Sequence, residues 1–239
     1  MTFQETLASE PIKQLQRDLF FSIENESHRG AVLLAVTVLE DHLLNCVKNI
    51  YPDDKSDDKD LFNRLFGKHG IFKGLDKAPK ILYALGHVNK TTYTAIDKLR
   101  AIRNKAAHLN TPFDLNDEEW KGTFNEVFNL GPGMSKYVGD IALQAAADEI
   151  IEQLKSILDE HLDSTEEKQE YFTKMIPEYS NAFNRKAERR IPYLKLAIGV
   201  PIICALVTYG FNKTDHELSW KLNLDYEEIE DEIPRCLQG

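Results

Sequence analysis

Apolar residues recur at helical spacing along most of this 239-residue chain, and this periodicity constrains the fold more than any other feature. The clearest example lies at residues 28–50, where the apolar positions are Val32, Leu33, Val36, Leu39, Leu43, Leu44 and Val47. Such a pattern predicts a helix that is buried on most sides. Only 12 Gly and 9 Pro punctuate the chain, fewer than the turns of a sheet-rich fold would need. We therefore predict an all-α fold.

The same periodicity predicts further helices at 9–23, 61–66, 78–85, 91–107 and 135–162, then a charged helix at 166–190 that breaks near Pro177. Gly67 and Gly86 are expected to end the two short helices. The Gly-Pro-Gly sequence at 131–133 is the clearest break in the chain. We expect an up-and-down helical bundle over residues 1–130 and a helical C-terminal extension over residues 134–239.

Charge and cysteine content limit the class of protein. A net charge of −10 disfavours binding along duplex DNA, which requires clustered Lys and Arg. The three cysteines are far apart in sequence, which argues against a disulfide framework. The first residues lack the basic and apolar regions of a signal peptide. We expect a cytoplasmic protein.

Two C-terminal segments raise alternatives. The apolar run at 191–211 could span a membrane, but Lys195 and Pro201 interrupt it, and its charge-free part is shorter than the roughly 20 residues of a span. We expect a buried core helix and no membrane contact. The segment 214–232 has the rhythm of a helix-turn-helix, yet its second helix would place carboxylates against phosphates. A helical pair that binds a partner or packs in a dimer is the better interpretation.

The most informative string is Arg100-x-x-Arg103-Asn104-x-x-x-His108, at the end of the helix predicted at 91–107. Arg100 and His108 each lie four residues from Asn104, so one helix face presents them together. An imidazole transfers protons near neutral pH, and a guanidinium stabilises the charge of a pentacoordinate phosphorus. This set suits RNA cleavage without a metal. The structural alternative is that the helix dipole favours basic residues in a last turn.

Other polar residues give weaker signals. Glu40 and Asp41 interrupt the apolar pattern at 28–50, where they either position the arginine cluster or form a polar stripe. The remaining histidines are scattered without metal-ligand spacing, and no nucleotide-binding fingerprint is present. We therefore expect no metal and no cofactor.

Residues 26–114 resemble the mannitol operon repressor family. The resemblance lies in five strings: Ser27-His28-Arg29-Gly30-Ala31, Leu39-Glu40-Asp41-His42-Leu43, Leu65-Phe66-Gly67, Lys80-Ile81-Leu82-Tyr83-Ala84-Leu85-Gly86 and Ile102-Arg103-Asn104-Lys105-Ala106-Ala107-His108. The last string is also similar to the signature of the HEPN superfamily, in which an Arg and a polar residue precede a His. That likeness implies a helical bundle, metal-independent ribonuclease activity in toxin or phage-defence systems, and an active site formed by a homodimer.

Three hypotheses follow from the sequence. The first is a HEPN-like ribonuclease in which Arg103 stabilises transition-state charge, His108 transfers protons and Asn104 orients the reacting groups. Arg100 would support them. The second is a non-catalytic, mannitol-repressor-like regulator of transcription that acts through protein–protein contacts, with the C-terminal extension as its partner surface. The third is an antitoxin or scaffold that keeps the fold without activity. A His108 buried against the core would favour the regulator over the ribonuclease.

Overall fold

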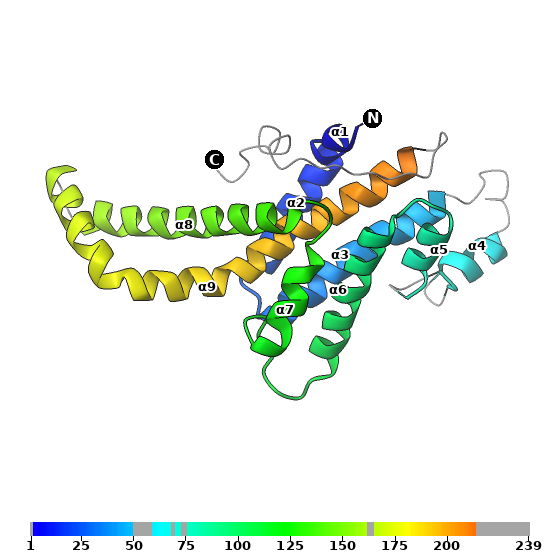
Figure 1. The fold of residues 1–239 in the computed structure, drawn as a ribbon, viewed down its shortest axis with the longest axis horizontal. Helices are drawn as coiled ribbons and strands as arrows, with labels where there is room; N and C mark the ends of the chain where they lie inside the picture. The colour runs from blue at the N-terminus through cyan, green and yellow to red at the C-terminus, as the bar shows by residue number, and fades with distance from the viewer. Residues whose placement is uncertain (1, 50–58, 68–69, 73–75, 162–164, 214–239) are drawn as a thin grey trace.

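The computed structural model describes residues 2–49, 59–67, 70–72, 76–161 and 165–213. Every regular element in these ranges is an α-helix (Figure 1), which confirms the all-α prediction. The helices are α1 (Phe3–Leu7), α2 (Glu10–Ile23), α3 (His28–Asn49), α4 (Lys59–Phe66), α5 (Ala78–Ala84), α6 (Lys90–His108), α7 (Glu118–Val127), α8 (Met134–His161) and α9 (Thr165–Asn212). The tail at 214–232, with its helix-turn-helix rhythm, lies outside the described residues.

Local capping signals fix several helix ends. The Asn89 side chain accepts a hydrogen bond from the Thr92 backbone N–H at 2.8 Å and begins α6, and the Ser27 hydroxyl accepts one from the Gly30 N–H at 3.1 Å in the first turn of α3. Both contacts satisfy N–H groups that a helix start leaves unpaired. Gly86, just after α5, has a φ of 78°. Glycine is the residue that most readily adopts this left-handed conformation, as predicted for the end of this helix.

The structure differs from the sequence-based helices at three places. The short helices α1 and α7 were not predicted. The charged stretch 166–190 and the apolar run 191–211 form one helix, α9, without an interruption at Pro177. An internal proline costs a helix about 3 kcal/mol. Packing of α9 against other helices offsets this local cost. Helix propensity alone does not include such packing.

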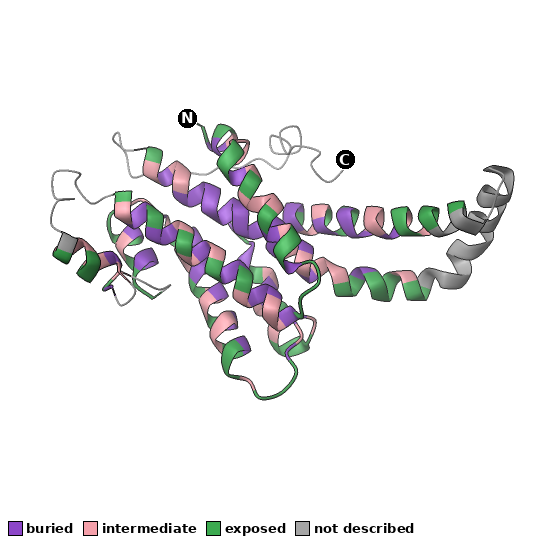
Figure 2. Ribbon diagram, turned by 180° about the vertical axis from the view of Figure 1, so that it is seen from behind, coloured by how far each residue is buried: buried purple, intermediate pink, exposed green. Residues whose placement is uncertain are grey.

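The apolar half of α9 is the centre of the core. Residues 196–207 are all buried, and this half packs against α1, α2, α3 and α8 (Figure 2). α8 runs beside α9 as a long hairpin that extends away from the other helices (Figure 1). Buried residues from both sides of the Gly-Pro-Gly break belong to one cluster. The described residues before and after this break therefore contribute to one continuous core.

Within the described ranges, two helices are long and apolar enough to cross a membrane by length and composition alone, at His28–Asn49 and Asn181–Asn212. The most apolar windows of these helices are 50% and 78% buried inside the protein, respectively. Core helices of soluble proteins pass the same test. The run 191–211 therefore has the packing predicted for a core helix.

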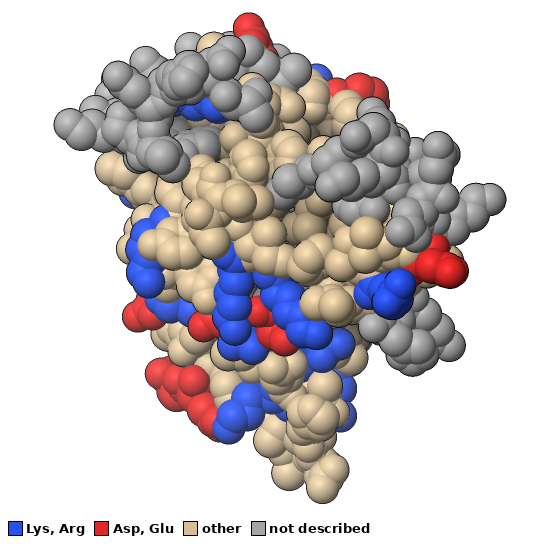
Figure 3. Space-filling model, turned by 90° about the vertical axis from the view of Figure 1, so that its right-hand side faces the viewer, with Lys and Arg blue, Asp and Glu red and all other residues tan. Residues whose placement is uncertain are grey.

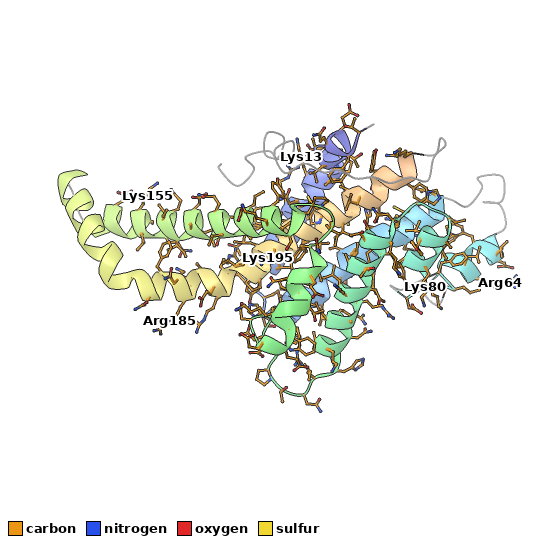
Figure 4. The ribbon with its side chains drawn as sticks, in the orientation of Figure 1. Lys13, Arg64, Lys80, Lys155, Arg185 and Lys195 are labelled. Carbon is orange, nitrogen blue, oxygen red and sulfur yellow. The ribbon has the colours of Figure 1, made fainter. Side chains whose placement is uncertain are left out.

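Lys195 shows how a charged residue is accommodated in this run. It lies near the crossing of α9 and α7 (Figure 4), where its Nζ donates a hydrogen bond to Asn125 Oδ1 at 2.8 Å. Burial, reinforced by the positive charge of Lys121, lowers the pKa of Lys195. The long aliphatic stem packs beside the apolar core while the amine reaches a polar partner at its edge.

Gly199 lies at a close contact between α9 and Phe128. A Cβ atom at this position of α9 would lie 2.1 Å from Cε1 and 2.2 Å from Cδ1 of Phe128, whose ring is only 1% exposed. We predict that Gly199→Ala lowers the melting temperature by about 5 °C, because overpacking a core costs about 1–3 kcal/mol. Thermal unfolding followed by circular dichroism measures the change.

Gly122→Ala is the matched control, because no atom beyond its chain neighbours and the adjacent backbone of α7 lies within 4 Å of the Cβ position at Gly122. Alanine favours a helix over glycine, so this variant should melt at the wild-type temperature or slightly above. Equal melting temperatures for the two variants would contradict the tight contact between Gly199 and Phe128.

Candidate functional site

The predicted site residues lie along the C-terminal half of α6. Arg103 and Asn104 are half-buried and joined by a hydrogen bond from Arg103 Nη1 to Asn104 Oδ1 at 3.2 Å. His108 is exposed in the last turn. Among the described residues, His108 makes no hydrogen bond or ion pair with either of them. One chain therefore presents a guanidinium–amide pair and a separate, accessible imidazole.

Arg100 is held within its own helix. Its Nε and Nη2 donate to Asp97 Oδ1 at 3.0 and 2.7 Å. Glu40 and Asp41, which the sequence offered as partners of the arginine cluster, lie on the neighbouring helix α3, the first half-buried and the second exposed. The carboxylate that positions Arg100 is therefore Asp97, and a positioning role for Glu40 or Asp41 stays a prediction.

Arg29 fixes the end of α6, a role that was not predicted. Its Nη2 donates to the carbonyl oxygens of Leu109 at 2.8 Å and Thr111 at 2.6 Å. Carbonyl groups at a helix C-terminus lack partners within the helix, and a cation there also complements the helix dipole. The start of α3 therefore determines where the chain goes after His108. Arg29 belongs to one of the strings that resemble the mannitol operon repressor family. The sequence could not show its role, because Leu109 lies 80 residues further along the chain.

His28 forms a second polar junction beside Arg29. It is 9% exposed, and its Nδ1 lies 2.6 Å from Asp114 Oδ1 and 3.2 Å from the Leu115 backbone nitrogen. Its ring packs on Tyr193 of α9 with centroids 4.8 Å apart. His28 thus joins the start of α3, the segment after α6 and α9. Its contacts are structural, because they leave little of the imidazole open to a ligand.

His42 links α3 to α9. Its Nε2 lies 3.1 Å from the carbonyl oxygen of Cys204 and 3.0 Å from Thr208 Oγ1. A carbonyl oxygen only accepts hydrogen bonds, so Nε2 carries the proton. Burial lowers the pKa of His42, and the bond to Cys204 partly opposes this effect. The residue is therefore neutral in the folded protein at pH 7.

Neither described cysteine is a candidate nucleophile. Cys46 and Cys204 are buried and free. Burial raises the pKa of Cys46 to about 11 and that of Cys204 still further. A nucleophilic cysteine requires an accessible thiolate, which these surroundings disfavour. In the part of the chain that the structure describes, no three His, Cys, Asp or Glu residues are grouped to hold a metal ion.

A groove between α2, α8 and α9 is a feature that the sequence did not indicate. Its cavity volume is about 580 Å³, and its surface is mostly apolar. The lining residues are Gln16, Arg17, Phe20 and Phe21 from α2, Glu24 just after it, Ala145, Asp148, Glu149, Glu152 and Gln153 from α8, and Leu194, Ala197 and Ile198 from α9. Sequence periodicity cannot find such a groove, because it depends on how three distant helices cross.

These features describe an all-α bundle with a polar helix end on α6 and an apolar groove on α2, α8 and α9. A family model described as "Mannitol repressor" matches residues 22–162, more than half of the chain, and the chain belongs to that family. The match extends beyond the resemblance noted at 26–114 and covers α3 to α8, whereas α1 and α9 lie outside it. No match was found among curated proteins or among solved structures.

His42 predicts a pH dependence of stability. Its pKa is lowered in the folded state relative to about 6.5 in an unfolded chain. Below that pH the unfolded chain binds a proton that the folded protein does not, so stability falls as the pH falls. We predict that the free energy of unfolding decreases from about pH 7 to pH 5.5, and that His42→Gln reduces this decrease. Urea denaturation at each pH measures it.

His108→Gln is the control, because this histidine is exposed and lies outside the core. It should keep the wild-type pH dependence. The same loss of stability in the His42→Gln variant as in the wild type would assign the pH dependence to other groups.

Proposed function

We propose that this chain is a non-catalytic regulator of the mannitol repressor family that acts by binding another protein through the groove between α2, α8 and α9. The observation that carries the proposal is the groove itself, with Phe21 standing 70% exposed at its edge. An exposed aromatic beside a concave apolar surface is typical of a protein-binding site. The net charge of −10 favours a protein partner over duplex DNA.

A cytoplasmic location and the absence of membrane contact form part of this proposal. Buried free thiols at Cys46 and Cys204 fit a reducing compartment. Packing of α9 within the bundle leaves its apolar surface in contact with protein. Fractionation of cells without detergent would test this part, since a protein retained in membranes at high salt would contradict it.

A strain lacking the gene tests the regulatory function. We predict that its transcript profile changes, that the wild-type protein restores the profile and that Phe21→Ser does not, because the partner loses its aromatic contact. Leu143→Ser is the matched control, since Leu143 of α8 is 53% exposed and does not line the groove. It should restore the profile, as should His108→Ala. RNA sequencing measures the outcome, and restoration by Phe21→Ser would contradict the proposal.

A second candidate function is metal-independent cleavage of RNA. The observation that favours it is the exposure of His108 at the end of the helix that carries Arg103 and Asn104. RNA cleavage requires an accessible imidazole, whereas a non-catalytic regulator does not. Lys and Arg side chains gather in a band on the face that carries α4 and α5 (Figure 3), with a few carboxylates among them. Such a local basic surface can hold RNA on an acidic protein.

An aromatic pair joins α5 to the first turns of α6. Tyr83 and Tyr93 stack with centroids 5.0 Å apart, and Lys90 Nζ lies 5.9 and 5.8 Å from the two ring centroids. Exposed aromatic faces next to cations bind unpaired bases. Cleavage would need two proton-transfer groups, and a single chain supplies only one His108. This candidate therefore requires a symmetric homodimer that brings two copies of α6 together, like that of HEPN ribonucleases.

In this reaction the 2′-hydroxyl loses its proton to one His108 and attacks phosphorus, and the bond to the 5′-oxygen breaks as that oxygen takes a proton from the other His108. The products carry a 2′,3′-cyclic phosphate and a 5′-hydroxyl. We predict that His108→Ala lowers the rate about a hundredfold or more. Arg103→Lys should be almost as damaging as Arg103→Ala, because an ammonium lacks the planar fork of a guanidinium. Incubation with labelled RNA measures the rate.

Lys105→Ala is the matched control, because Lys105 is an exposed cation of the same helix turn that sits over Trp120. It should cleave at the wild-type rate, and DNA should remain intact. Cleavage that persists in His108→Ala, or that EDTA stops, would contradict this site. A monomer in light scattering at micromolar concentration would contradict the dimer.

A further inference from the structure

The floor of the groove consists of small and aliphatic side chains. Ala145 of α8 and Ala197 of α9 lie beside Leu194 and Ile198, and none of the four exceeds 5% exposure. Because alanine side chains are small, the groove is deeper at Ala145 and Ala197 than it would be with larger residues there. Above the floor stands Phe21, whose ring meets that of Phe20 edge-on with centroids 5.8 Å apart. The groove therefore has an apolar binding surface with one exposed aromatic side chain along its edge.

The rim of the groove is acidic. Four of the lining residues are carboxylates and one is an arginine: Glu24, Asp148, Glu149, Glu152 and Arg17. The Arg17 guanidinium already pairs with Glu10. Arg190 neutralises the charge of Glu149 through two hydrogen bonds at 2.7 and 3.0 Å. The same guanidinium forms a longer ion pair with Glu24 at 3.8 Å. The remaining negative charge is concentrated at the α8 edge.

Asp148 and Glu152 form that edge. They are four residues apart on α8, so their side chains project from one face of the helix. Lys155 pairs with Glu152 at 2.7 Å, but both partners are more than half exposed, and exposed pairs of this kind contribute little. Gln144 Nε2 donates to Asp148 Oδ1 at 2.9 Å, a neutral contact that leaves the negative charge of Asp148 in place. Both carboxylates can therefore attract cations of a ligand that lies along the apolar floor.

We infer that the groove binds a basic amphipathic helix of the partner protein, an inference that rests on the proposed regulatory function. The apolar face of such a helix would cover the floor and Phe21, and its Lys and Arg side chains would lie beside Asp148 and Glu152. Residues 214–239 of this chain carry eight carboxylates and two basic side chains, so their charge disfavours them as the occupant.

The position of the groove shows that it depends on segments outside the family match. Seven of the thirteen lining residues fall outside residues 22–162, namely Gln16, Arg17, Phe20, Phe21, Leu194, Ala197 and Ile198. The whole α9 floor is among them. The matched region supplies the acidic α8 edge, whereas Phe21 and the α9 part of the floor come from segments that the family match does not include.

Fluorescence anisotropy with the full chain tests the inference. The probe is a labelled helical peptide of about 18 residues with Leu along one face and Lys elsewhere, compared with the same peptide carrying Glu in place of Lys. We expect the Lys peptide to bind about tenfold more tightly than the Glu peptide, and more weakly as salt is raised. Phe21→Ser and the double variant Asp148→Asn/Glu152→Gln should each weaken binding about fivefold or more.

Leu143→Ser should bind the Lys peptide like the wild type, and circular dichroism of each variant checks that it is folded. Equal binding of the two peptides, or no effect of the Asp148→Asn/Glu152→Gln variant, would overturn the basic helix. Restoration of the transcript profile by the double variant but not by Phe21→Ser would support the regulatory function of the groove and contradict a basic helix as its ligand. Dissociation of a wild-type dimer by Phe21→Ser in sedimentation would identify a second copy of the chain as the occupant and overturn the inference.

Discussion

Burial of the apolar half of α9 is the interaction on which the rest of the structure depends. This helix touches α1, α2, α3, α6 and α8, and removing its apolar surface from water supplies the main driving force for packing them together. Phe128 packs so closely on α9 that only glycine fits at position 199. The helices of the family match at 22–162 thus close around a helix that lies outside it.

Polar contacts with α9 add geometric specificity to this apolar packing. His42 contacts Cys204 and Thr208 from α3, and Lys195 contacts Asn125 of α7. Each buried polar group that reaches a partner avoids the cost of lost hydration, whereas a shifted helix would leave it unpaired. These contacts set the axial position of α9. They thereby place Leu194, Ala197 and Ile198 in the floor of the groove.

The two candidate sites occupy different parts of the molecule and depend on different elements. The groove needs α9, because its floor comes from that helix. The polar end of α6 needs the start of α3, where Arg29 holds the carbonyl groups that follow His108. Substitutions can therefore alter the groove without changing the polar end of α6, and the reverse. This separation is what allows variants at Phe21 and at His108 to distinguish a regulator from a ribonuclease.

The sequence by itself determined the helical class, the bounds of α3 and α6 to within a residue or two, and the sharing of one helix by Arg100, Arg103, Asn104 and His108. Each of these follows from periodicity or from caps that act over a few residues. Only the tertiary structure decided that α9 continues through Pro177, that Arg29 holds the carbonyl groups after α6 and that His28 joins α3 to Asp114 and Tyr193. The groove also emerged only there. The physical reason is that contacts between residues far apart in the chain depend on how helices cross, which local spacing does not encode.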